Sequence, residues 1–204
     1  MKKIIVAILI MATFLMVGCG NMAEILPNDD DNTTVVNSED GQAPVSEDSV
    51  AETRELQEYA PSSGSYTISI HEIDGGWTVY PDTGNEEQLV LDNEDMSFSI
   101  LMQSFPKVSD AYQDFATFEE FYRTATSSSM GEGTVENITI DNAAILNHSS
   151  MLYTVDSQGY TFYGQITVFE TENAYYSCTI TGLDRIYTKY IDEYEDLYNS
   201  FEEK

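Results

Sequence analysis

Basic residues are scarce in this sequence. Its 204 residues include eight Lys and Arg against 36 Asp and Glu, which gives a formal charge of −28 at pH 7. Because nucleic-acid binding relies on Lys and Arg to contact phosphates, this shortage argues strongly against that class of function. It also argues against a polybasic patch for a membrane surface. We therefore expect no nucleic-acid partner.

Cysteine and histidine are also rare, with two of each. Two cysteines cannot form a disulfide-rich scaffold. His71 and His148 each lie near an expected strand, and neither has metal-ligand spacing to another His or to a Cys. We expect both histidines to be structural. The sequence offers no diagnostic motif for a catalytic, metal-binding or cofactor-binding residue, so none is assigned.

An uncharged run lies near the start of the chain. After Met1, Lys2 and Lys3, residues 4–18 form fifteen positions without a charge. A membrane-spanning helix needs about 20 apolar residues, so this run is nearer to the core of a signal peptide. It ends in Leu-Met-Val-Gly-Cys at positions 15–19, which resembles the bacterial lipobox. The resemblance implies that a diacylglycerol is joined to the sulfur of Cys19 and that the chain is cut before Cys19.

We therefore expect residues 1–18 to be a lipoprotein signal peptide and Cys19 to be the lipid attachment site. The mature protein would be anchored in a bacterial cell membrane and would face the extracytoplasmic side. The alternatives are an uncleaved anchor or ordinary secretion, with a chance cysteine at position 19. If Cys19 carries the lipid, Cys178 is the remaining thiol, and its strand-like neighbours include no basic residue to lower its pKa. We expect a buried, structural cysteine there.

The composition changes between residues 19 and 62. Positions 20–62 hold 11 acidic residues, one basic residue and one aromatic residue. Such a segment has too little apolar surface to offset the entropy lost on ordering, so we predict a disordered acidic tether. A spacer is the favoured interpretation, and an acidic segment that binds cations or a basic partner is the alternative.

Residues 63–204 contain the apolar periodicity of a folded domain. Alternating residues predict strands near 66–70, 96–102 and 160–170, and further strand-like runs lie between 135 and 181. Thr117 and Glu120 have the spacing of a capping box, which predicts a helix that fades near residue 127. A second amphipathic helix is expected over 183–201. This order predicts an α+β domain in which two main helices cover an antiparallel β-sheet.

The order of these elements resembles that of the PsbP/Mog1/DcrB-like lipoproteins of bacteria. The segments that carry the resemblance are residues 76–79, 96–100, 117–122, 160–180 and 198–201. The resemblance implies an α/β/α sandwich and binding or assembly roles that are mostly non-enzymatic. It transfers no metal-binding or partner-binding residue, because no site motif is visible.

Two further patterns have weak functional interpretations. Ser104 and Lys107 match the Ser-x-x-Lys pattern of penicillin-interacting enzymes, but they follow an expected strand rather than open a helix. The acidic residues at 82–87 and 92–95 could bind Ca²⁺ if the strands brought them together, although their spacing matches no known calcium loop. We interpret them as a solvated acidic loop.

The sequence as a whole favours a non-catalytic binding or assembly module held outside the membrane by Cys19. Residues 63–204 carry 25 acidic and 5 basic residues, a formal charge of −20, which favours a basic envelope protein as the partner. Two alternatives stay open. One is an envelope-acting hydrolase with an unobvious site, and the other is a ligand-binding lipoprotein associated with a transporter.

Overall fold

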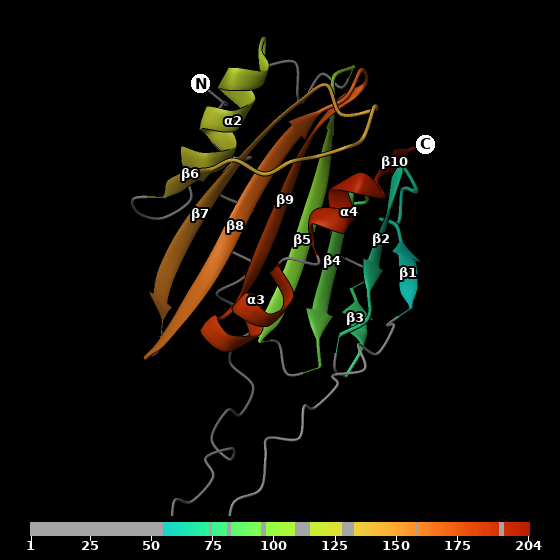
Figure 1. Cartoon of the computed structure of the whole chain (residues 1–204). Helices are drawn as coiled ribbons and strands as arrows, with labels where there is room; N and C mark the ends of the chain where they lie inside the picture. Colours follow the sequence, from blue (N-terminus) through green and yellow to red (C-terminus); the bar gives the residue numbers. More distant parts are fainter. Residues whose placement is uncertain are drawn as a thin grey trace, which may run out of the picture. The chain divides into compact units, whose positions relative to one another are not determined.

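An antiparallel sheet of seven strands forms the centre of the part of the chain that the structure describes (Figure 1). In spatial order its strands are β3 (Trp77–Val79), β4 (Gln88–Asn93), β5 (Phe98–Pro106), β9 (Ala174–Leu183), β8 (Tyr160–Glu170), β7 (Asn147–Ser157) and β6 (Thr134–Glu136). The long strands β7, β8 and β9 follow one another in the chain and pair as neighbours. The predicted antiparallel sheet is confirmed.

The computed structural model describes residues 55–73, 75–80, 83–94, 97–108, 115–127, 133–157, 159–191 and 194–204. All of them belong to one unit, Arg54–Lys204. Cys19, the expected signal peptide and most of the expected tether lie outside the described residues. No helix within the described ranges has the length and apolar character needed to cross a membrane.

A second, smaller sheet contains three strands in the described residues, in the order β1 (Leu56–Tyr59), β2 (Tyr66–His71) and β10 (Glu202–Glu203). Strand β1 lies inside the 19–62 segment for which we predict disorder, yet it pairs with β2 from Leu56↔His71 to Tyr59↔Ile68. The ordered structure therefore extends into that segment. A composition averaged over the whole segment hides a four-residue strand that is held by backbone pairing to β2.

Helix α2 (Phe118–Ser127) begins where the capping pattern predicts. The backbone N–H of Glu120 donates to Oγ1 of Thr117 (3.2 Å), and Oε2 of Glu120 accepts from the N–H of Ala116 (2.9 Å). The first contact satisfies a backbone donor that the start of the helix leaves unpaired, and the second holds the residue before the cap.

The expected helix over 183–201 is two short helices, α3 (Asp184–Tyr190) and α4 (Glu195–Asn199). The described residues therefore contain three short helices. The expectation of two main helices is corrected to this extent. Tyr194 N–H donates to Ile191 O (3.0 Å), and Leu197 N–H donates to Tyr194 O (3.1 Å). These i to i−3 bonds belong to a tighter turn than an α-helix. The three-and-four spacing of apolar residues continues across this turn, so periodicity alone does not reveal that the helix is interrupted.

Helices cover both faces of the seven-stranded sheet. Tyr175 and Tyr176 are neighbours on β9, so their side chains lie on opposite faces. The ring of Tyr175 stacks on Phe121 of α2 (4.9 Å between centroids), whereas the ring of Tyr176 packs on Phe201, just beyond α4 (4.8 Å). Figure 1 shows α3 and α4 in front of the sheet. The layers are thus α2, the sheet, and a layer that contains α3 and α4.

The main hydrophobic core lies between the sheet and the α3–α4 layer. It is built mostly from alternate residues of β2, β4, β5 and β9, together with aromatic residues after position 186. Its fully buried members include Ile68, Leu91, Phe98, Ile100, Met102, Cys178, Ile180 and Leu197. The alternation predicted for 96–102 is confirmed at Phe98, Ile100 and Met102, and Met96 lies outside the described residues.

Candidate functional site

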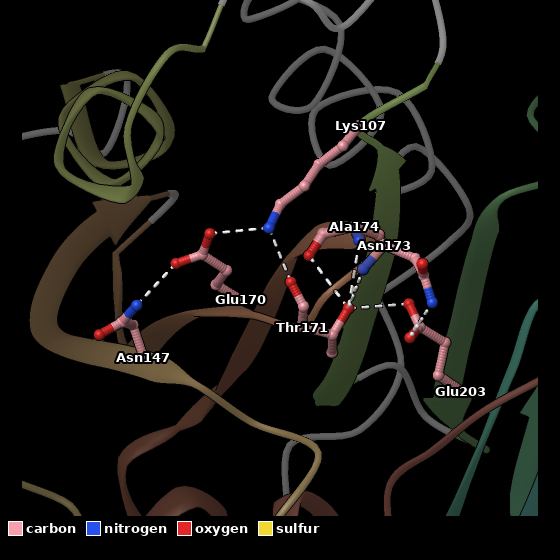
Figure 2. Close-up of polar contacts among 7 residues, drawn as sticks. All are labelled: Lys107, Asn147, Glu170, Thr171, Asn173, Ala174 and Glu203. Carbon is pink, nitrogen blue, oxygen red and sulfur yellow. Dashed lines mark hydrogen bonds and ion pairs between the residues drawn. The ribbon is translucent and has the colours of Figure 1, made fainter.

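Polar side chains gather at one end of the two sheets, where several strands begin or end. Lys107 follows β5, Asn147 opens β7 and Glu170 closes β8. The register brings these ends together, since Pro106 pairs with Ala174, and Asn147 pairs with Glu170. Figure 2 shows the resulting polar cluster, which also includes Thr171, Asn173 and Glu203.

Lys107 forms the first half of this cluster. Its Nζ lies 2.7 Å from Oε1 of Glu170 and donates to the carbonyl oxygen of Thr171 at 2.7 Å. The ammonium also lies 4.8 Å from the ring centre of Tyr175, within the range of a cation–π contact. Oε2 of Glu170 accepts a 2.7 Å hydrogen bond from Nδ2 of Asn147. Both oxygens of Glu170 therefore have partners.

These contacts set the charge state of Glu170. Partial burial by itself raises the pKa of this carboxyl, but the hydrogen bonds from Lys107 and Asn147 and the nearby positive charge outweigh burial. The pKa of Glu170 is therefore held below its ordinary value, and the group is ionised at neutral pH. A carboxylate in this state is a poor general acid.

Glu203 forms the second half of the cluster. Its Oε1 accepts hydrogen bonds from Thr171 Oγ1 (2.8 Å) and from the hydroxyl of Tyr176 (2.9 Å). Its Oε2 accepts from Nδ2 of Asn173 (2.9 Å). Burial, followed by the nearby charge of Glu203, raises the pKa of Tyr176, so this phenol stays protonated and remains a donor. Since Glu203 belongs to β10 and Tyr176 to β9, this carboxylate links the two sheets.

The cluster is suited to holding strand ends together. Lys107 is engaged by a carboxylate and a carbonyl, and each oxygen of Glu170 and Glu203 already accepts a hydrogen bond. No motif in the sequence predicts this cluster. One signal was available, because Lys107 is one of five basic residues among positions 63–204 and is placed directly after a strand.

The Ser-x-x-Lys pattern has no catalytic arrangement. Ser104 lies on β5 rather than at a helix start, and its hydroxyl donates to Oε2 of Glu87. Lys107 binds Glu170 instead. The serine and the lysine therefore bind different groups. A lysine that activates a serine nucleophile would instead be hydrogen-bonded to that serine.

The two histidines lie in different sheets. His71 ends β2, and its backbone carbonyl accepts a 3.1 Å hydrogen bond from Nε1 of Trp77. His148 lies on β7, and its Nε2 is 3.1 Å from the carbonyl oxygen of Ile138. Within the described ranges, no group of three or more His, Cys, Asp or Glu side chains could hold a metal ion.

The acidic residues near β4 do not converge. Glu87 accepts hydrogen bonds from Ser65 and Ser104. Asp92 accepts one from Ser99, and burial raises the pKa of Asp92. Glu87 lies in the turn before β4, whereas Asp92 lies near the other end of that strand, so the two carboxylates are held by different partners. Asp82 and Asp95 lie outside the described residues.

Cys178 is fully buried on β9 and is a free thiol. Burial raises the pKa of this thiol to about 12, so it is protonated and unreactive in the folded protein. This environment is that of a structural cysteine.

No protein-family model matches the chain, and no curated protein matches it. Among solved structures, a Bacteroides thetaiotaomicron protein matches at 12% identity with a TM-score of 0.45; the match covers 72% of this chain and 48% of that one. The Saccharomyces cerevisiae Ran-binding protein Mog1p matches at 12% identity and a TM-score of 0.45, over 74% of this chain and 96% of its own. The PsbP protein of Synechocystis matches at 12% identity and a TM-score of 0.39, over 80% and 98%.

Structures of the Mog1 and PsbP type are thus among the matches, in agreement with the family resemblance noted from the sequence. The first of these matches is to a longer protein, of which this chain spans about half. Likenesses at this level of identity and TM-score carry no assignment of activity, ligand or partner.

Proposed function

We propose that this protein is a bacterial lipoprotein, anchored to the membrane through Cys19, whose domain acts outside the cytoplasm as a non-catalytic binding or assembly module. The observation that carries the proposal is the sequence of the first 19 residues, in which two lysines, an uncharged run and a lipobox-like ending occur in that order. An uncharged run of this length is typical of the core of an export signal peptide rather than of a membrane-spanning helix.

The state of the polar side chains supports a non-catalytic role. An acid–base catalyst needs a group with a tuned pKa that can reach a substrate. Lys107, Glu170 and Glu203 are each engaged by neighbouring protein groups, and Cys178 is a buried, protonated thiol. Lys107, Glu170 and Glu203 instead hold strand ends together.

The charge distribution supports a basic partner. Lys107, Arg123 and Lys204 each form an ion pair with a glutamate of the same domain. Many acidic side chains are exposed, including Glu86, Glu94, Glu120, Asp156, Glu172 and Asp196. With 25 acidic residues against 5 basic ones over 63–204, the domain attracts cationic surfaces and repels anionic polymers.

The anchor is tested with Cys19→Ala, and Cys178→Ala is the matched control because it also removes one thiol. Membrane and soluble fractions of the native host are compared by immunoblot. Cys19→Ala should leave the membrane fraction or accumulate as an uncut precursor, whereas Cys178→Ala should stay lipidated. Normal processing and membrane attachment of Cys19→Ala would refute the anchor.

The binding role is tested by cross-linking in native membranes followed by mass spectrometry. A specific partner with a basic contact surface should be recovered at low salt and lost progressively as salt is raised, because exposed charges are screened. Recovery of an acidic partner that is insensitive to salt would contradict the proposed mode of binding.

A further inference from the structure

Strand β1 leaves one side of the smaller sheet open. In the order β1-β2-β10, β2 lies between the other two strands, and no strand among the described residues pairs with the far side of β1 (Figure 1). Glu55, just before β1, continues the ladder, because its carbonyl oxygen accepts a hydrogen bond from the N–H of Glu72 (3.3 Å). The edge strands of the larger sheet, β3 and β6, have three residues each, against four in β1. Strand β1 is therefore the longest open edge that the structure describes.

Hydrogen bonds of β2 show which way its backbone groups point. The N–H of Ser69 donates to Oγ of Ser200 (2.8 Å), and the carbonyl oxygen of Ser69 accepts from the same hydroxyl (2.9 Å). Ser200 comes just before β10, which lies on the side of β2 away from β1. Backbone groups of successive residues in a strand point to alternate sides, so Ile68 and Ile70 direct theirs toward β1.

The same alternation fixes the direction of the backbone groups in β1. The two isoleucines pair with Tyr59 and Gln57, so these residues of β1 use their N–H and C=O groups on β2. Leu56 and Glu58 therefore direct theirs to the open side. Both of their side chains are exposed, that of Leu56 by 55%. An extended segment laid along this side would meet two donors and two acceptors that are already aligned.

The charge around this edge is negative. Glu58 and Glu55 are exposed, and Glu72 lies opposite Glu55 in the ladder. Lys204, on the far side of β2, is already in an ion pair with a glutamate of β10, and Arg54 lies outside the described residues. The open edge therefore favours a segment that carries positive charge.

We propose that the open edge of β1 binds an extended basic segment of a partner protein, which joins the smaller sheet as a further strand. The inference rests on the proposed function, because it gives the basic partner of that proposal a place to bind. The backbone of β1 supplies the hydrogen bonds, and the two exposed glutamates supply the preference for basic side chains. A second copy of this chain is a poor occupant, since it would place glutamates of like charge side by side.

The pairing geometry predicts which sequence fits this edge. In an antiparallel addition, the residue opposite Glu58 comes two positions before the residue opposite Leu56, and the residue opposite Glu55 comes one position after it. Basic residues match the two glutamates, and an apolar residue matches the leucine. The preferred segment therefore has the order basic, any residue, apolar, basic.

NMR titration of the ¹⁵N-labelled full chain in mild detergent tests the site. The probe is the capped peptide Ser-Thr-Lys-Thr-Val-Lys-Thr-Ser. It should shift the amide signals of Leu56 and Glu58 and slow their hydrogen exchange, and its affinity should fall as salt is raised. Absence of binding, or shifts confined to residues 20–54, would overturn the proposal.

Two changes each remove one hydrogen bond along the edge without altering charge. An N-methyl group on the peptide valine removes the donor that faces the carbonyl oxygen of Leu56, and Leu56→Pro removes the N–H of Leu56. Each change should weaken binding about fivefold or more, as for the loss of one hydrogen bond. Leu56→Ala keeps the N–H and is the matched control, so it should bind more tightly than Leu56→Pro. Proline is tolerated on an edge strand where the N–H faces outward, and urea unfolding of Leu56→Pro checks that the fold is intact.

The outcomes separate this inference from the proposed function. Salt-dependent binding that neither change weakens would overturn the edge site and leave the basic partner standing. An acidic partner recovered by cross-linking would instead contradict the proposed function. Sedimentation of the free chain detects the other occupant, because a dimer that Leu56→Pro dissociates would show that a second copy uses the edge and would overturn the proposal.

Discussion

The hydroxyl of Tyr176 donates a 2.9 Å hydrogen bond to Oε1 of Glu203, and this contact joins the central strand of the seven-stranded sheet to β10 of the smaller sheet. Thr171 and Asn173 bond the same carboxylate from the β8–β9 turn. One glutamate thus accepts hydrogen bonds from three residues, two in the β8–β9 turn and one on β9. The stability of the contact between the sheets should depend on this residue more than on its exposed neighbours.

Replacing Glu203 with alanine should destabilise the domain by about 1–3 kcal/mol, because three donors lose their acceptor and one of them, Tyr176, is buried. Urea unfolding of the full chain measures the change. Glu202→Ala is the matched control, since Glu202 forms an exposed ion pair with Lys204, and we expect no measurable effect. Equal stabilities of the two variants would show that Glu203 does not link the sheets.

Acidification should weaken the Lys107–Glu170 pair. The folded-state pKa of Glu170 lies below its ordinary value of 4.5, so the pair contributes stability above that pH and the contribution is lost as pH falls through the folded-state pKa. Lys107→Met should cost about 1–2 kcal/mol at pH 7, because both partners are only partly exposed. Unfolding curves collected from pH 7 to pH 3 should show wild type and variant converging at the acid end. A difference that stays constant over this range would mean that the Glu170 charge is not involved.

A methyl group at position 164 should be poorly tolerated. A Cβ built on Gly164 would overlap the ring of Tyr153, which crosses this glycine so that its hydroxyl lies 3.0 Å from Oγ1 of Thr181. Gly164→Ala should therefore cost about 1–3 kcal/mol by overpacking. In a Tyr153→Ala background the same substitution should cost much less, because the overlapping ring is gone. An equal loss of stability in both backgrounds would show that the overlap with Tyr153 is not the cause.

The thiol of Cys178 should resist modification in the folded state. Its complete burial and raised pKa leave almost no exposed thiolate for an alkylating reagent. In a Cys19→Ala background, iodoacetamide should label the chain slowly without denaturant and quickly in concentrated guanidinium chloride. A Tyr160→Cys variant provides an exposed control and should be labelled at once. Rapid labelling of native Cys178 would contradict its assigned environment.

The large sheet was predictable because apolar and polar residues alternate along several of its strands. Phe98, Ile100 and Met102 are buried on one face, as their spacing predicts, and the 160–170 strand has the expected bounds. The prediction for that strand was incomplete in one respect, since residues 164–169 are all buried and both faces of the sheet are covered there. Alternation identifies the strand, but it does not reveal that α2 covers the second face.

Three features could not be predicted from the sequence pattern, each for a physical reason. Strand β1 contains few apolar residues and is held by backbone pairing, which leaves little trace in composition. The break between α3 and α4 preserves the spacing of Tyr190, Tyr194 and Leu197, so the apolar stripe continues through it. The Lys107, Glu170 and Glu203 cluster joins residues up to 96 positions apart. The pairing of β5 with β9 and of β9 with β8 brings Lys107 and Glu170 together, and Glu203 reaches the cluster from β10 of the smaller sheet.

The central claim, that Cys19 carries the lipid anchor, is tested most directly by intact-mass and peptide mass spectrometry of the native protein extracted from membranes. We predict a chain that begins at Cys19 and carries a diacylglyceryl group on that sulfur. Recovery of a chain that retains residues 1–18 and has an unmodified thiol at Cys19 would contradict the account.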